Sequence, residues 1–167
     1  MEDKVMLQYL ITQQHYFVLK LFSALGCGLI AGVFFAFSTF VMNALARLQS
    51  AQGITAMQSI NITVINPLFM AVFLGTAAAC ILLTISSLLR WHQPGAAYLL
   101  LGSLLYLVGT FGVTIVFNVP LNEALARVEP DSSIGASLWS SYLANWTIWN
   151  HIRAAASLTI ALCDRGA

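Results

Sequence analysis

Four long apolar segments, joined by short polar connections, constrain the fold of this chain more than any other feature of its sequence. They cover about residues 17–42, 67–89, 98–117 and 146–163. A helix needs roughly 20 apolar residues to cross the ~30 Å hydrocarbon core of a bilayer, and each segment is close to that length. We therefore predict an all-α protein, an integral membrane four-helix bundle in which residues 1–167 form a single transmembrane domain. A short interfacial helix is expected before the first span, over about residues 5–16.

The composition supports a bilayer environment and excludes several classes of protein, a soluble enzyme among them. Hydrophobic residues make up 59% of the chain and charged residues 8%, whereas soluble domains carry about 25% charged residues. The net charge of +1 provides no positive field for nucleic acid, so we expect no nucleic-acid partner. We also expect no metal site, because no carboxylate lies in any apolar segment and the three cysteines are not spaced as zinc ligands.

The basic residues near the ends of the spans predict the orientation of the chain. Four spans place both termini and the 90–97 turn on one side of the membrane, here called the terminal side. The 43–66 and 118–145 connections then share the other side, here called the polar side. The terminal side carries Lys4, Lys20, Arg90 and Arg165, and the polar side carries Arg47 and Arg127. Since lysine and arginine are enriched in cytoplasmic loops, we expect both termini to be cytoplasmic.

The asparagines, unlike the basic residues, are concentrated on the polar side. All seven asparagines belong to the polar side: Asn43, Asn61, Asn66, Asn118, Asn122, Asn145 and Asn150.

Arg153 lies about two turns into the fourth span, roughly 10 Å from its start at 1.5 Å per residue. An arginine at a helix centre costs about 2.5 to 3.5 kcal/mol on insertion scales, so we expect its side chain to face the bundle interior.

Residue types alone leave two interpretations of Arg153 open. Either it is a structural clamp that donates hydrogen bonds to Asn66, Asn118 and main-chain carbonyls, or it holds an anionic ligand or intermediate in a pocket on the polar side. His151, next to the same helix face, is either a polar tip at the interface or a catalyst. Glu123 is either a solvated charge or a base.

Three motifs carry a resemblance to a known family: Ala31-Gly-Val-Phe-Phe-Ala-Phe-Ser38, Asn118-Val-Pro-Leu-Asn122 and Trp146-Thr-Ile-Trp149-Asn150-His151-Ile-Arg153. Together they resemble the anthrone oxygenase-like family of small four-helix membrane proteins, over about residues 20–160. The resemblance implies oxidation of a tricyclic anthrone by O2 to the anthraquinone, without metal or flavin, so no cofactor is expected. Because many members are bacterial, we expect the chain in a bacterial cytoplasmic membrane.

Chemistry of this kind, which proceeds through an enolate, needs a base, donors for the enolate oxygen and a flat apolar slot. The base would be His151, and the donors would be Arg153, Asn118 and Asn66. The other residues expected to contact the substrate are Trp146, Trp149, Asn150, Asn61, Asn122 and Phe37.

A non-catalytic membrane protein is the alternative, either an accessory subunit of a larger complex or a lipophile-binding module. Membrane lipid is an expected partner in every case, and a lipophilic aromatic small molecule is expected in the catalytic one. Assembly into a homo-oligomer or a larger membrane complex is compatible with both alternatives.

Overall fold

The computed structural model describes residues 2–163, and these form helices without any strand. The first helix is continuous but changes geometry along its length, through α1 (Glu2–Ala36), the π-helical segment η1 (Phe37–Val41) and α2 (Met42–Leu45). Two separate helices follow, α3 (Ser50–Thr63) and α4 (Pro67–Leu89). The all-α membrane bundle is confirmed, but the described residues form five continuous helices rather than four.

The fourth continuous helix also contains π-helical turns. It comprises α5 (Ala96–Leu104), η2 (Leu105–Gly112), η3 (Thr114–Asn118) and α6 (Val119–Ala126). The last helix is α7 (Ser133–Cys163). A π-helix closes i→i+5 hydrogen bonds and is rare outside single widened turns, which occur frequently at functional sites.

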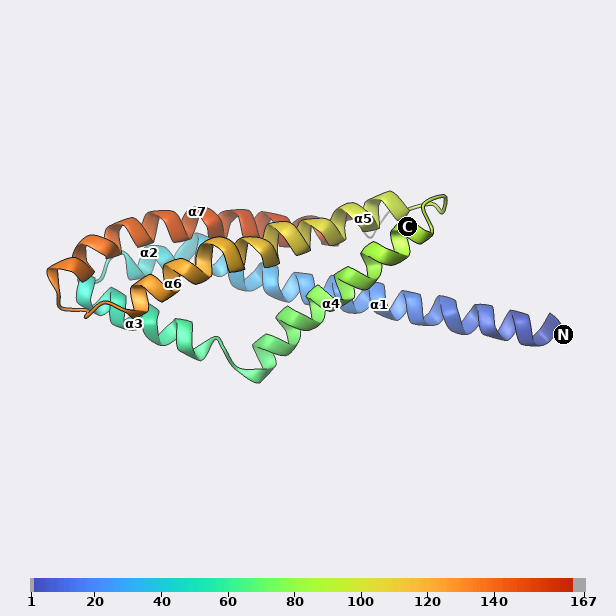
Figure 1. Cartoon of the computed structure of the whole chain (residues 1–167), viewed down its shortest axis with the longest axis horizontal. Coiled ribbons are helices and arrows are strands. Elements are labelled where there is room, and N and C mark those ends of the chain that lie inside the picture. Colours follow the sequence, from blue (N-terminus) through green and yellow to red (C-terminus); the bar gives the residue numbers. More distant parts are fainter. Residues whose placement is uncertain (1, 164–167) are drawn as a thin grey trace.

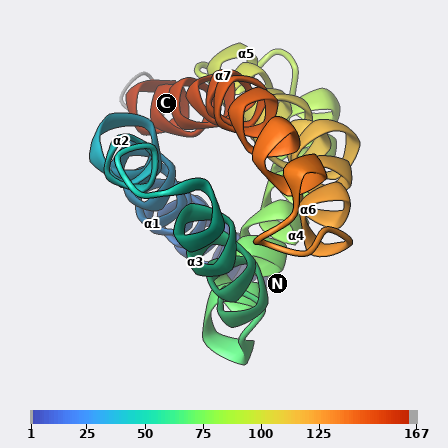
Figure 2. The same cartoon turned by 90° about the vertical axis from the view of Figure 1, so that its left-hand side faces the viewer.

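Neighbouring long helices run in opposite directions, and different connections lie at the two ends of the bundle (Figure 1). The N-terminal part of α1, the turn between α4 and α5 and the last turns of α7 lie at one end. The α2–α3 connection and the α6–α7 loop lie at the other end, as the end-on view confirms (Figure 2). α7 packs against α1, α3, α5 and α6 and against all three π-helical segments, so it is the central helix of the bundle.

Three helices are long and apolar enough to cross a membrane: Lys4–Leu45, Pro67–Leu89 and Ala96–Ala126. They contain three of the four predicted spans, and the protein is an integral membrane protein. α7 is not among them, so the fourth span stays a prediction. The separate interfacial helix expected over residues 5–16 is instead the beginning of α1, which extends beyond the other helices (Figure 1). Arg165, which contributed to the predicted orientation, lies outside the described residues.

Local sequence signals explain where α4 and α5 begin. Asn66 precedes α4, and its Oδ1 accepts a hydrogen bond from the main-chain N–H of Phe69 at 3.0 Å. Pro67 occupies the first turn, where a missing N–H costs nothing. Gly95 precedes α5 with φ of 82°, a left-handed conformation that residues with a Cβ adopt at a cost.

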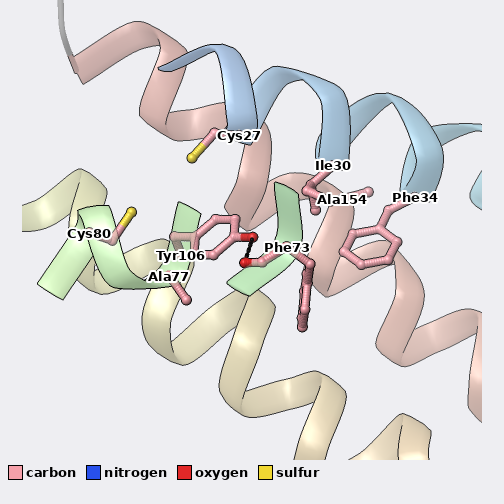
Figure 3. Packing of buried hydrophobic residues seen from close by; sticks show 8 residues of the cluster. All are labelled: Cys27, Ile30, Phe34, Phe73, Ala77, Cys80, Tyr106 and Ala154. Atoms are coloured by element: carbon pink, nitrogen blue, oxygen red, sulfur yellow. Dashed lines mark hydrogen bonds between the residues drawn. The ribbon is translucent and has the colours of Figure 1, made fainter. Parts of the chain in front are cut away.

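Two buried clusters hold the helices together. The first joins α1, α4, η2 and α7, where the Tyr106 hydroxyl donates to the Phe73 carbonyl at 3.1 Å (Figure 3). Its members are Cys27, Ile30, Phe34, Phe73, Ala77, Cys80, Tyr106 and Ala154. The second joins α2, α3, α6 and α7 at the polar side, through Met42, Leu45, Ile54, Met57, Leu125, Trp139, Tyr142 and Trp146.

Candidate functional site around Arg153

The Arg153 side chain points into the bundle, as predicted, and is 4% exposed. Its Nη2 donates to Asn150 Oδ1 at 2.8 Å, and its Nη1 donates to Thr114 Oγ1 at 3.3 Å. The guanidinium carbon lies 4.2 Å from the ring centroid of Phe34 and 5.0 Å from that of Trp146. Two hydrogen bonds and two cation–π contacts therefore fix the orientation of the cation.

Asn150 connects this arginine to the first helix. Its side chain is fully buried, and its Nδ2 donates to the Phe34 carbonyl and to Ser38 Oγ, both at 2.7 Å. Its remaining amide atom, Oδ1, is the acceptor for Arg153. The donor group of this amide binds the first helix, and its acceptor binds Arg153 on α7. Asn150 therefore aligns α7 with the junction of α1 and η1.

Hydrogen bonds from η2 and η3 complete the polar cluster. Thr110 Oγ1 and Ser157 Oγ are 2.8 Å apart, and the Ser157 hydroxyl donates to the Arg153 carbonyl at 2.8 Å. Asn118 is 1% exposed, and its Nδ2 donates to the Trp146 carbonyl at 3.3 Å. We call Ser38, Thr114, Asn118, Asn150 and Arg153, with the rings of Phe34 and Trp146, the Arg153 cluster.

All three π-helical segments of the described residues contribute to this polar network. Ser38 belongs to η1, Thr110 to η2, and Thr114 and Asn118 to η3. A widened turn shifts the direction of the side chains that follow it, so the π-helical turns help to direct these polar groups towards α7. The fold thus departs from regular helix geometry where the polar residues converge.

The electrostatics of the cluster are unusual for a buried arginine. Among the side chains that the structure describes, the one ion pair joins the exposed residues Arg127 and Glu123, at 3.7 Å, so Arg153 has no carboxylate partner among them. Arg153 Nε and Asn118 Oδ1 are buried and have no hydrogen-bond partner. A buried cation with an N–H still unpaired is a place where an anion is stabilised strongly, because little solvent screens the interaction.

The structure brings together five of the residues predicted for the site. Asn118, Asn150, Arg153 and Trp146 belong to the Arg153 cluster, and the Phe37 ring lies 5.5 Å from that of Trp146. The donors, the enclosing aromatic side chains and the cation therefore come from three continuous helices that are distant in sequence.

Three other predicted residues lie apart from this cluster. Asn66 is exposed and caps α4. His151 is exposed on α7, whereas its neighbour Asn150 and Arg153 are buried. Trp149 stacks on Phe117, with centroids 3.6 Å apart.

The last two predicted residues, Asn61 and Asn122, line a groove between α3 and α6. This α3–α6 groove has a volume of about 650 Å³, and its other lining residues are Gln58, Ile62, Ile65, Val119, Glu123 and Ala126. Asn61 Nδ2 is buried without a hydrogen-bond partner. Asn122 Oδ1 accepts from Trp146 Nε1 at 2.9 Å. The Trp146 indole therefore contacts Asn122, one of the residues that line the groove, through its N–H, and contacts Arg153 through its ring.

Sequence reasoning missed Phe34, Thr110 and Ser157, and it gave no role to Thr114. A usable signal was present, because Thr110, Thr114 and Asn118 follow one another at four-residue spacing in an otherwise apolar span. The contribution of Phe34 had no such signal, since several phenylalanines surround it.

The anthrone oxygenase family model matches residues 68–163, which is more than half of the chain and includes α4 to α7. The matched segment carries Thr114, Asn118, Asn150 and Arg153, whereas Phe34 and Ser38 precede it. No curated protein and no solved structure matches the sequence.

Proposed function

Since this chain belongs to the anthrone oxygenase family, we propose that it is a membrane oxygenase that oxidises a lipophilic aromatic substrate of the anthrone type with O2. The observation that carries the proposal is the buried Arg153 guanidinium, which has an unpaired Nε and no carboxylate partner in the described structure. Such a group stabilises an enolate oxygen in the way that oxyanion-hole donors do.

The proposed reaction balances without a further reductant. A base removes one proton from the activated methylene of the anthrone, which gives an enolate. The carbanionic carbon of the enolate transfers electrons to O2 and forms a carbon–oxygen bond, and protonation gives a hydroperoxide. Loss of water, with the second methylene hydrogen, leaves the carbonyl of the anthraquinone. In total, one anthrone and one O2 give one anthraquinone and one water.

The α3–α6 groove provides the approach to Arg153 in this proposal. Its lining joins apolar side chains to amides, which suits a flat lipophile with a polar edge. Trp146 contacts both Asn122 of the groove lining and Arg153, so we propose that a substrate in the groove reaches the cation when this indole moves. Glu123 lines the groove and His151 does not, so we assign the base role to Glu123.

A non-catalytic lipophile-binding module is the second candidate. It is favoured by one observation, the 4% exposure of Arg153, since an arginine enclosed by Phe34 and Trp146 also fits a structural clamp. In that case, the groove would bind a lipophile without converting it.

Oxidation of a model anthrone by the purified full-length chain separates these candidates. We expect O2 consumption and anthraquinone formation in a one-to-one ratio, with one ¹⁸O atom in each quinone when ¹⁸O2 is used. Asn118→Ala should reduce the rate, because it removes a buried amide beside Trp146. Asn66→Ala is the matched control, since Asn66 caps α4 outside the cluster. Quinone formation no faster than spontaneous oxidation would refute the catalytic proposal.

A further inference from the structure

A second polar cleft is formed on the terminal side. The segments that bound it lie at the opposite end of the bundle from α3 and the end of α6 (Figure 1). It has a volume of about 600 Å³ and is bounded by the N-terminal half of α1 and by the turn between α4 and α5. Tyr16 and Lys20 line it from α1, and Arg90 and Gln93 line it from the turn. The oxygenase proposal gives no role to these residues.

Two cations in this cleft converge on one aromatic ring. Lys20 Nζ lies 5.4 Å from the Tyr16 ring centroid, and the Arg90 guanidinium carbon lies 4.8 Å from the same centroid. Neither cation forms an ion pair with an acid whose side chain the structure describes. Two positive charges on the same ring repel each other, and an anion that contacts both would relieve the repulsion.

The donor set fits a phosphate group. An arginine guanidinium binds phosphate oxygens in a bidentate manner, and a lysine ammonium adds a point charge. The amides of Gln13 and Gln93 also line the cleft and provide neutral donors.

The position of the cleft relative to the spans identifies the source of that phosphate. Lys20 lies near the start of the first predicted span, and Arg90 follows the last residue of α4, so both lie at the depth of lipid headgroups. Phe17 and Leu21 are exposed beside Lys20 on α1 and provide an apolar surface for acyl chains. Basic pockets between membrane helices on the cytoplasmic side bind anionic headgroups.

We propose that this cleft is a specific binding site for an anionic phospholipid, whose phosphate is held between Lys20 and Arg90. Tyr16 positions the two cations through its ring, and the acyl chains lie along the outer face of α1. The site is independent of the oxygenase reaction, and it predicts that the terminal side faces the leaflet that is richer in anionic lipid.

Native mass spectrometry of the full-length chain in detergent tests this proposal with defined lipids. We expect phosphatidylglycerol to bind with a stoichiometry of one at low concentration, and phosphatidylcholine to bind at least about tenfold more weakly. The double variant Lys20→Gln/Arg90→Gln should weaken phosphatidylglycerol binding by about tenfold or more. The single variant Arg90→Lys keeps the charge and leaves Lys20 unchanged, so it should retain part of the affinity for phosphatidylglycerol.

The matched control is Arg47→Gln/Arg127→Gln, which removes two cations at the other end of the bundle and should leave phosphatidylglycerol binding unchanged. Equal loss in both double variants would overturn the proposal in favour of a net-charge effect. Displacement of the lipid by millimolar inorganic phosphate would overturn it in favour of a free-anion site. Thermal unfolding of each variant verifies that a loss of binding comes from a folded protein.

Discussion

Arg153→Lys is the substitution that separates a clamp from a catalytic cation most sharply. Lysine keeps the positive charge but has no planar fork, so its ammonium cannot donate to Asn150 and Thr114 in the observed geometry while lying between two rings. A hydrogen bond to a charged group contributes about 1.5 to 3 kcal/mol, and a buried cation–π contact contributes up to about 2 kcal/mol. Since lysine retains some of each, we expect a net loss of about 2 kcal/mol in stability.

Two measurements on the same purified variant distinguish the roles. A loss of about 2 kcal/mol corresponds to a decrease of about 4–8 °C in Tm for a chain of this size, which Trp fluorescence reports during heating. Removal of one oxyanion-hole donor typically lowers kcat by about 10²- to 10³-fold, so we expect anthraquinone formation at saturating substrate to fall by about 100-fold. Both rates are measured well below the Tm of the variant.

The matched control is Arg47→Lys, at an exposed side chain in the connection between α2 and α3. It should change neither Tm nor kcat, because substitutions at exposed positions have small effects on stability. If Arg153→Lys lowers Tm but leaves the rate of oxidation unchanged, Arg153 is only a clamp. If it changes neither quantity, the energetic argument for the Arg153 cluster is wrong as well.

Three further predictions concern helix packing and geometry. Gly109→Ala should destabilise the bundle by about 1–3 kcal/mol in thermal unfolding, because its Cβ would lie 2.6 Å from a side-chain carbon of α7, whereas Gly28→Ala meets nothing within 4 Å and should not. Cys27 of α1 and Cys80 of α4 are buried in the same cluster (Figure 3), so both thiols should resist maleimide labelling in the folded protein and become labelled after denaturation. Deletion of Ile115 within η3 should lower Tm less than a one-residue deletion in α5, since a π-helical turn already accommodates an extra residue.

The part of the fold that sequence could predict follows from the bilayer. Segments without charge have few alternatives to a spanning helix, so the apolar stretches located α1, α4 and the α5–α6 helix. The inward orientation of Arg153 was predictable for the same reason, since facing lipid would be costly, and its 4% exposure confirms it. The partners of Arg153 were not predictable, because they depend on the rotation of each helix about its axis.

The asparagines show why a shared membrane side does not imply a shared site. Asn118 and Asn150 join the Arg153 cluster, Asn61 and Asn122 line the α3–α6 groove, and Asn66 caps α4. An asparagine at a helix end caps the helix as readily as it binds a ligand, so its position along the sequence does not determine its role.

Glycine spacing also fails to identify the packed face of α1. Gly28 and Gly32 have the four-residue spacing of closely packed membrane helices, yet a Cβ at either position would meet nothing within 4 Å. Close approaches occur instead at other glycines, among them Gly26, against Thr76, and Gly109, against Ala156. The spacing of two glycines therefore does not identify which face of a helix packs against its neighbour.

The modest apolarity of α7 is explained by its central position. A helix in contact with lipid on all sides must be apolar on all sides, whereas α7 is surrounded by other helices over much of its circumference. Its buried face carries Asn150, Arg153 and Ser157, while Ile148 and Ile152 are exposed on the other face. Cluster residues therefore account for part of its low average hydropathy, and exposed polar residues in its first half, Ser137, Ser140, Ser141 and Asn145, account for another part. A span that buries polar site residues is expected to have a lower average hydropathy than one that faces lipid on all sides, so the low value for α7 does not contradict the prediction that α7 crosses the membrane.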